Sequence, residues 1–156
     1  MKERIRVGGF VLMLGWLGCG GRMPEGLGVD HDRLAPCPNK PNCVSSFATD
    51  PAHRIDPLAI RGRPDVAWAA LRALLDGDPR VESVDADGNY IHAVFVTPLM
   101  RYRDDAEFLL QPDGGQIAVR SASRVGYGDM GANRKRIESI RARLAEQGVV
   151  EAGATD

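Results

Sequence analysis

The alternation of apolar and polar residues along the chain predicts two helices and a set of strands. Residues 64–76 (PDVAWAALRALLD) repeat apolar side chains at helical spacing behind Pro64, which is favoured in a helix's first turn. Residues 81–86, 90–98, 105–111 and 116–123 alternate with a period of two, as strands do. Residues 132–146 return to helical spacing, with Ile137, Ile140 and Leu144 on one face.

The order of these elements predicts an α+β fold. We expect an antiparallel sheet of about four to five strands, the fifth from residues 54–60, with both helices packed on one face. A chain of 156 residues is ordinary for one domain, which we place at residues 34–148. Residues 149–156 are then expected to be a frayed tail.

The first residues differ in composition from the rest. Lys2, Arg4 and Arg6 precede residues 7–18, an uncharged apolar run that would span roughly 18 Å as a helix, short of the ~30 Å core of a bilayer. This pattern predicts an export signal over residues 1–18. Residues 19–33 are rich in glycine and polar residues and are predicted to be a tether.

Cys19 directly follows Gly18 in an arrangement that resembles the lipobox of bacterial lipoproteins. The resemblance implies that Cys19 receives lipid and becomes the mature amino terminus. The protein would then be held on a membrane of the cell envelope and face the periplasm. Plain secretion and a short retained membrane anchor are the alternatives.

Two further cysteines, Cys37 and Cys43, lie in the sequence CPNKPNC. In an oxidising compartment they most simply form a disulfide that closes a short loop. The alternative is a metal site, but His31 and His53 nearby lack the spacing of zinc ligands. No motif predicts a cofactor, and we expect none.

Charge excludes one class of partner. Twenty Lys and Arg against twenty-one Asp and Glu leave a net charge of -1, so no bulk field draws the chain to nucleic acid. Aromatic residues make up 6% of the chain, which disfavours a stacking platform for single strands. Residues 120–143, however, contain seven Lys or Arg and two acids, and this local excess of positive charge favours a local cationic site.

The register of the hairpin over residues 105–123 follows from its four-residue turn. Pairing Gln111 with Gln116 sets Glu107 opposite Arg120 and assigns side chains to two faces. One face is apolar and is expected to pack on the helices, together with Ser121 and Ser123. The other contains Asp105, Glu107, Leu109, Arg120 and Arg124, which one interpretation makes cross-strand ion pairs on a solvated face.

A second interpretation joins Arg120 and Arg124 with Arg134, at the start of the last helix, in one site for an anionic ligand or headgroup. Cations in a first helical turn oppose the helix dipole, so either a bound anion or a cap from Asp129 or Asn133 would compensate them. Glycines in the preceding turn would let the backbone approach the anion. The hypothesised ligand-binding residues are Asp105, Arg120, Ser121, Ser123, Arg124, Gly126, Asp129, Asn133 and Arg134.

Catalysis is less favoured than binding. No GxSxG, HExxH or P-loop motif occurs. A triad of Ser121 or Ser123 with His92 and Asp105 conflicts with the inferred faces, because the serines and Asp105 point to opposite sides of the sheet. A hydrolase is therefore the weakest alternative, whereas an envelope scaffold that binds protein and no small ligand remains open. The sequence does not indicate an oligomeric state.

Two segments, CPNKPNCVSS and RSASRVGYGDMGANRKRI, resemble the hallmark segments of the DUF1499 family, whose members are often predicted to be envelope proteins. The resemblance extends over residues 34–144. It implies domain limits and leaves the activity open. The implied signature positions are Cys37, Cys43, Asp105, Arg120, Ser121, Ser123, Arg124, Gly126, Asp129, Asn133 and Arg136.

Overall fold

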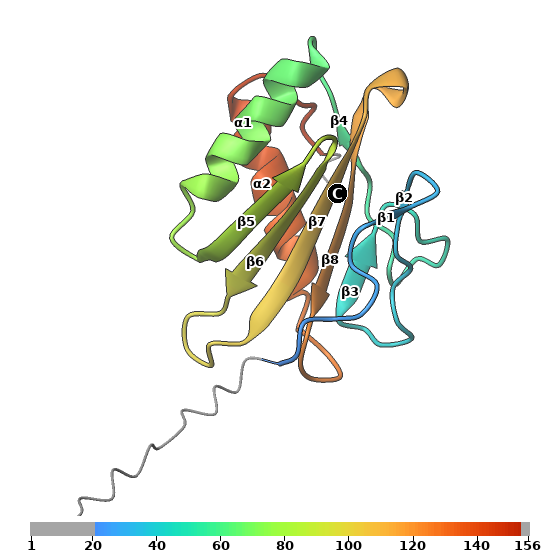
Figure 1. Ribbon diagram of the computed structural model, residues 1–156, viewed down its shortest axis with the longest axis vertical. Helices are drawn as coiled ribbons and strands as arrows, with labels where there is room; N and C mark the ends of the chain where they lie inside the picture. The colour runs from blue at the N-terminus through green and yellow to red at the C-terminus, as the bar shows by residue number, and fades with distance from the viewer. Residues whose placement is uncertain (1–20, 154–156) are drawn as a thin grey trace, which may run out of the picture.

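The computed structural model describes residues 21–153, so the predicted signal and Cys19 lie outside the described residues. Two short strands come first, followed by a mixed series of strands and two helices (Figure 1). The elements are β1 (Val29–Asp30), β2 (Arg33–Leu34), β3 (Cys43–Ser45), β4 (Leu58–Ala59), α1 (Pro64–Asp76), β5 (Val81–Asp87), β6 (Tyr90–Val96), β7 (Arg103–Gln111), the 3-10 turn η1 (Pro112–Gly114), β8 (Gln116–Ser123) and α2 (Ala132–Glu146).

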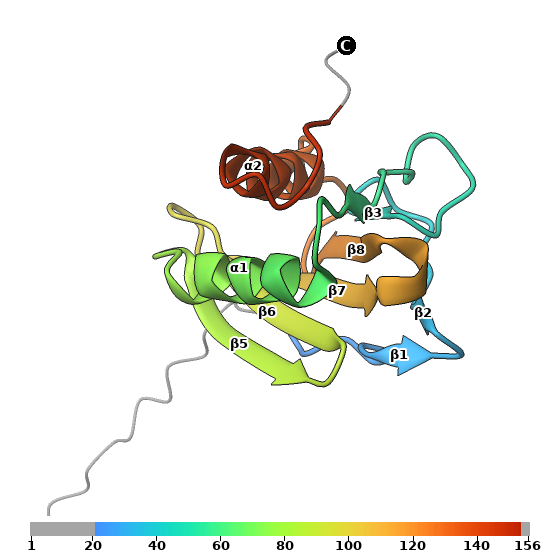
Figure 2. The same cartoon turned by 90° about the horizontal axis from the view of Figure 1, so that it is seen from above.

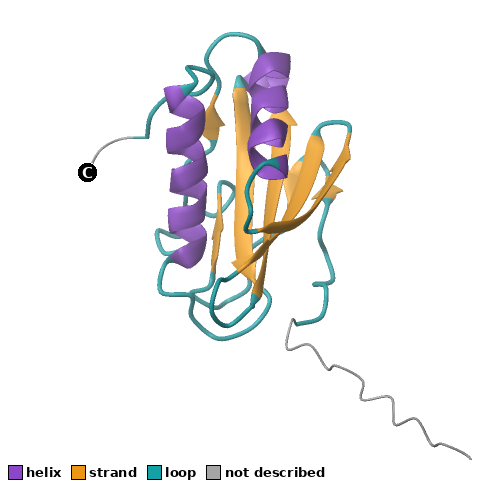
Figure 3. Cartoon of the chain, turned by 90° about the vertical axis from the view of Figure 1, so that its left-hand side faces the viewer, coloured by secondary structure: helices purple, strands orange, loops and turns teal. Residues whose placement is uncertain are grey.

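The predicted α+β architecture is confirmed. The main sheet is antiparallel with the order β3-β8-β7-β6-β5, and β4 also pairs with β8, which makes six strands within residues 21–153. The sheet exceeds the predicted four to five strands because β3 comes from the cysteine segment, which was expected to be a loop. Figures 2 and 3 show α1 and α2 on one face of this sheet.

The predicted hairpin register is confirmed, with Gln111 opposite Gln116 and Glu107 opposite Arg120. Period-two alternation then directs Phe108 toward the helices, where it packs with Leu71 of α1 and Ile137 of α2 in the main core. Burial of these apolar faces is the principal force that holds the helices on the sheet.

The amino-terminal segment, residues 21–34, is not the expected tether. Its short hairpin β1–β2 lies on the sheet face opposite the helices (Figure 2). Leu34 is buried in a second, small apolar cluster with Leu109 and Ala118, and the Gly28 N–H donates to Glu107 at 2.8 Å. The sheet therefore has cover on both faces, and the expected solvated face is wrong.

The frayed tail was predicted to start at residue 149, but residues 149–151 are attached to the domain. Val150 is buried, the Arg61 N–H donates to the Val149 carbonyl, and the Glu151 N–H donates to the Ala59 carbonyl. These bonds attach the residues after α2 to the β4 segment. Within the described chain, neither helix has the combination of length and apolar character needed to cross a bilayer.

Candidate functional site

The face beneath the amino-terminal segment contains a buried group of ionisable residues, which we call the charged layer: His92, Asp105, Glu107, Arg120 and Arg124. Glu107 is fully buried and accepts hydrogen bonds from Arg120 Nη1 at 2.7 Å and from the Gly28 N–H at 2.8 Å. The Tyr90 hydroxyl donates to the same carboxylate at 2.8 Å. Glu107 thus connects β6, β8 and the amino-terminal segment to β7.

Asp105 is the second carboxylate of the charged layer. Arg124 donates to it from Nε at 2.9 Å and from Nη2 at 2.7 Å, and His92 Nε2 lies 2.8 Å from Oδ1. The predicted cross-strand ion pairs therefore exist, but they are buried. Burial removes their hydration, so these pairs depend on good geometry and on additional hydrogen bonds, which both carboxylates have.

Burial and neighbouring groups shift the pKa of Asp105, in this layer, and of Tyr90, which donates to it. Burial alone would raise the pKa of Asp105, but hydrogen bonds from His92 and Arg124 hold that pKa below its usual value. Burial, followed by the negative charge of Glu107, raises the pKa of Tyr90, so the phenol keeps the proton that it donates. Arg120 Nε is buried and has no hydrogen-bond partner among residues 21–153. The layer is thus a nearly closed network of internal pairs.

A separate polar cluster lies on the helix face, around Asn133 of α2. Its Nδ2 is 2.7 Å from the Asp129 carboxylate, 2.9 Å from Ser123 Oγ and 3.0 Å from the Asn42 carbonyl. Ser121 Oγ donates to Asn133 Oδ1 at 2.7 Å. Because Asn133 is fully buried, these bonds satisfy an amide that would otherwise be costly to enclose.

Arg136 completes this cluster. Its guanidinium donates to Asn133 Oδ1 and to Ser121 Oγ, forms an ion pair with buried Asp104, and lies over the Phe95 ring at 4.9 Å from the centroid. The arginine therefore joins α2 to β6, β7 and β8.

Three cations, Arg134, Lys135 and Arg136, lie near the start of α2, where they oppose the helix dipole. Asp129 compensates them. The Asp129 carboxylate accepts hydrogen bonds from the Gly131 N–H at 2.9 Å and from the Asn133 N–H at 2.8 Å. A carboxylate of the chain itself thus occupies the position at which a bound anion was hypothesised.

The three arginines of the hypothesised anion site are not brought together. Arg120 and Arg124 lie in the charged layer, whereas Arg134 donates to the Arg54 carbonyl at 2.7 Å on the helix side. Consecutive strand residues face opposite sides of a sheet, and α2 packs on the side away from Arg120. The single cationic site proposed from the sequence is therefore not formed.

The hypothetical triad is not assembled either. His92 and Asp105 do meet, but Ser121 and Ser123 are hydrogen-bonded to Asn133 on the other face of the sheet. The sheet therefore separates both serine hydroxyls from His92, whereas a triad requires the hydroxyl and the imidazole to be in hydrogen-bond contact.

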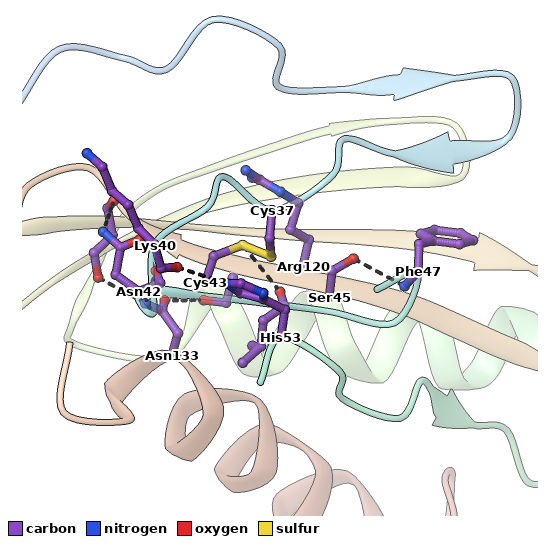
Figure 4. The surroundings of a disulfide bond; sticks show 12 residues. Cys37, Lys40, Asn42, Cys43, Ser45, Phe47, His53, Arg120 and Asn133 are labelled. Atoms are coloured by element: carbon purple, nitrogen blue, oxygen red, sulfur yellow. Dashed lines mark hydrogen bonds between the residues drawn. A yellow bond between two sulfur atoms is a disulfide. The ribbon is translucent and has the colours of Figure 1, made fainter. Parts of the chain in front are cut away.

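The predicted disulfide between Cys37 and Cys43 is confirmed (Figure 4). It closes the loop before β3, the edge strand that pairs with β8. Asn42, inside this loop, reaches the turn after β8 through a hydrogen bond from its Nδ2 to the Gly126 carbonyl at 3.0 Å. Among residues 21–153, no group of His, Cys, Asp and Glu side chains is arranged to hold a metal ion.

Sequence reasoning missed three contributors to these clusters: Asp104, Asn42 and Tyr90. Asp104, which pairs with Arg136, was not among the predicted site residues, although alternation from Ala106 predicts that it faces the helices. For Asn42 and Tyr90 the sequence contains no comparable signal, because their partners come from distant segments.

An open cleft of about 970 Å³ lies at the end of the molecule formed by η1 and the β5–β6 turn. The amino-terminal segment forms one wall, and Tyr90 and Leu109 line its base. Three acids also line it, Asp32, Asp87 and Asp113, and none of them forms an ion pair with another described residue. The cleft is therefore negative at its rim and partly apolar.

Comparison with known proteins gives a family but no activity. A family model described as "Protein of unknown function (DUF1499)" matches residues 33–144. Neither the curated proteins nor the solved structures include a match to the chain. The matched range contains the charged layer, the Asn133 cluster and the disulfide, and the chain belongs to the DUF1499 family.

Proposed function

We propose that the chain is a lipid-anchored protein of the bacterial cell envelope whose domain is a binding module for another envelope protein. The observation that supports this most is the path of the amino-terminal segment. Gly21, two residues after Cys19 of the lipobox-like sequence, already lies against the loop that follows β8, where a Cβ built on it would be 2.9 Å from Arg124 Cβ and Val125 Cγ2. A lipid on Cys19 would therefore hold the domain directly at a membrane, without a flexible tether.

The cleft is the binding site in this proposal. Its acidic rim suits a segment with Lys or Arg side chains, and Tyr90 and Leu109 offer apolar contact below the rim. A short segment of a partner protein provides both chemistries. The domain would then act as a scaffold rather than as a receptor for a small molecule.

A small anionic ligand was the other binding hypothesis. It is less favoured because Arg120 and Arg124 already pair with Glu107 and Asp105, and both pairs are buried. An anion would have to displace a carboxylate that the fold encloses, which leaves that carboxylate unpaired at high cost.

Photocrosslinking in intact cells tests the proposal. A photoreactive residue at exposed Asp113, on the cleft, is expected to yield a discrete adduct with one envelope protein. The same residue at exposed Glu146, on α2, is the control and is expected to yield none. Equal adducts at both positions would contradict the cleft as the binding site. A bound small molecule lost on Arg120→Ala, seen by native mass spectrometry, would instead support the anionic ligand.

A further inference from the structure

The end of the molecule opposite the cleft exposes large apolar side chains on two loops. Residues 97–102 connect β6 to β7, and residues 124–131 connect β8 to α2; both loops lie at the lower end of Figure 1. Leu99 is 89%, Met100 57%, Tyr127 72% and Met130 97% exposed. We call these four residues the apolar pole.

The two loops form one continuous end of the domain. Thr97 and Pro98 of the first loop line the same hollow, of about 400 Å³, as Ala132 and Lys135 after the second. The Arg124 N–H also donates to the Arg103 carbonyl at 3.1 Å, which joins the loops at their bases. Apolar side chains gathered in this way, unlike scattered ones, mark an interaction surface.

Burial within the domain does not explain the apolar character of these exposed side chains. Met130 has a φ of 53°, in the left-handed region that glycine and asparagine adopt with less strain, and its side chain is almost wholly exposed. Leu99 is similarly exposed. Neither residue gains burial within the domain, so their contribution must come from something outside it.

The path of the chain indicates what covers this end. Gly21 packs against the second loop, because a Cβ built on it would lie 2.9 Å from both Arg124 Cβ and Val125 Cγ2. Cys19 precedes Gly21 by two residues, and two residues of extended chain reach at most about 7 Å. A lipid on Cys19 would enter its bilayer beside the apolar pole.

Charge agrees with this placement. Arg22, Arg101 and Lys135 belong to the same end and form no ion pair with any described residue. The opposite end has the acidic cleft with Asp32, Asp87 and Asp113. A surface of anionic phospholipid would attract the cationic end and repel the cleft, which orients the domain.

We propose that the apolar pole inserts into the headgroup region of the anionic bilayer that holds the Cys19 lipid. Tyr127 suits this position because its ring is apolar and its hydroxyl can remain in the headgroup layer. The domain then stands on its two loops with the cleft directed away from the membrane. This inference rests on the proposed lipid anchor and adds an orientation to it.

Tryptophan depth measurements on the membrane-purified, full-length product test the orientation. The Tyr127→Trp variant is reconstituted in phosphatidylethanolamine–phosphatidylglycerol vesicles with and without brominated acyl chains, and the emission of the unsubstituted protein is subtracted. The Val66→Trp variant is the matched control, because Val66 is an exposed apolar residue next to Asp65 at the cleft end. We expect bromolipid to remove most of the added emission of Tyr127→Trp and to leave that of Val66→Trp unchanged.

Three results would overturn the orientation: no quenching of Tyr127→Trp, equal quenching of both variants, or a blue shift of Tyr127→Trp in detergent that grows with protein concentration. The last would assign the pole to a contact between copies of the chain. The denatured mass of the same sample separates the two claims. A mass without lipid overturns the anchor and the orientation with it, whereas a lipidated mass with unquenched Tyr127→Trp overturns the orientation alone.

Discussion

Arg124 holds Asp105 through two hydrogen bonds, of 2.9 Å from Nε and 2.7 Å from Nη2, in a pair whose side chains are 6% and 1% exposed. Both residues are among the signature positions that the family resemblance implies. The pair connects the end of β8 to β7 on the sheet face covered by the amino-terminal segment. Arg124, which the sequence suggested as a ligand-binding residue, therefore has its partner, Asp105, within the fold.

Removing one member of this pair is expected to cost much more than removing both. Arg124→Met leaves Asp105 buried without its main cation, so we expect the free energy of unfolding to fall by about 3–5 kcal/mol. The double variant Asp105→Asn with Arg124→Met should recover part of that loss. Urea denaturation measures both.

Arg72→Met is the control for that comparison, because Arg72 pairs with Asp76 on an exposed helix face. It is expected to change the stability by less than about 1 kcal/mol. Equal losses for Arg72→Met and Arg124→Met would show that burial of the Asp105 pair is not important.

Acid is expected to destabilise the domain through Asp105. The pKa of Asp105 is depressed in the folded state, so below about pH 4 the unfolded chain binds a proton that the folded chain does not. Its contribution is therefore complete above the unfolded pKa and is lost as the pH falls through the folded one. The Asp105→Asn variant, less stable at pH 7, should lose stability less steeply below pH 4. Parallel curves for the two proteins, from urea midpoints across that range, would contradict this role.

Asp129→Ala tests the cap of α2. The substitution removes the acceptor of the Gly131 and Asn133 N–H groups and of the buried Asn133 Nδ2, and we expect a loss of at least about 1 kcal/mol. Asp113→Ala is a suitable control, because Asp113 is exposed in η1. If phosphate restored the stability of Asp129→Ala, an anion would be shown to replace the carboxylate.

The amino-terminal segment is expected to contribute to stability despite its polar composition. Leu34→Ala should lower the free energy of unfolding by roughly 2–5 kcal/mol, because Leu34 is buried against Leu109 and Ala118. Val29→Ala, at a half-exposed position of β1, should change it by less than about 0.5 kcal/mol. A Leu34→Ala variant as stable as Val29→Ala would restore the tether interpretation.

The disulfide is expected to stabilise the domain by about 2 kcal/mol, the value for a loop of this length. The paired substitution Cys37→Ser with Cys43→Ser removes it without leaving a free thiol. Thermal unfolding should show the loss, and unchanged unfolding of the variant would mean that β3 is held by its pairing with β8 alone.

The sequence predicted those parts of the fold that a local sequence pattern determines without contacts from distant segments. Period-two alternation and the turn after Gln111 determined the hairpin register, and Pro64 marked the start of α1. The cover of the second face was missed because residues 21–34 have no periodicity and gain their structure from contacts such as Gly28 with Glu107. The burial of the charged layer was missed for the same reason. Charges at alternate strand positions are interpreted as solvated unless the contact with a distant segment is known.

The intact mass of the protein, purified from membranes after expression with its own residues 1–18, tests the central claim most directly. The account predicts a denatured mass equal to a chain that starts at Cys19 plus covalent lipid, and an unprocessed mass for the Cys19→Ser variant. A mass that retains Met1 in the unsubstituted protein, or a chain that starts at Cys19 without lipid, would contradict the lipid-anchored module.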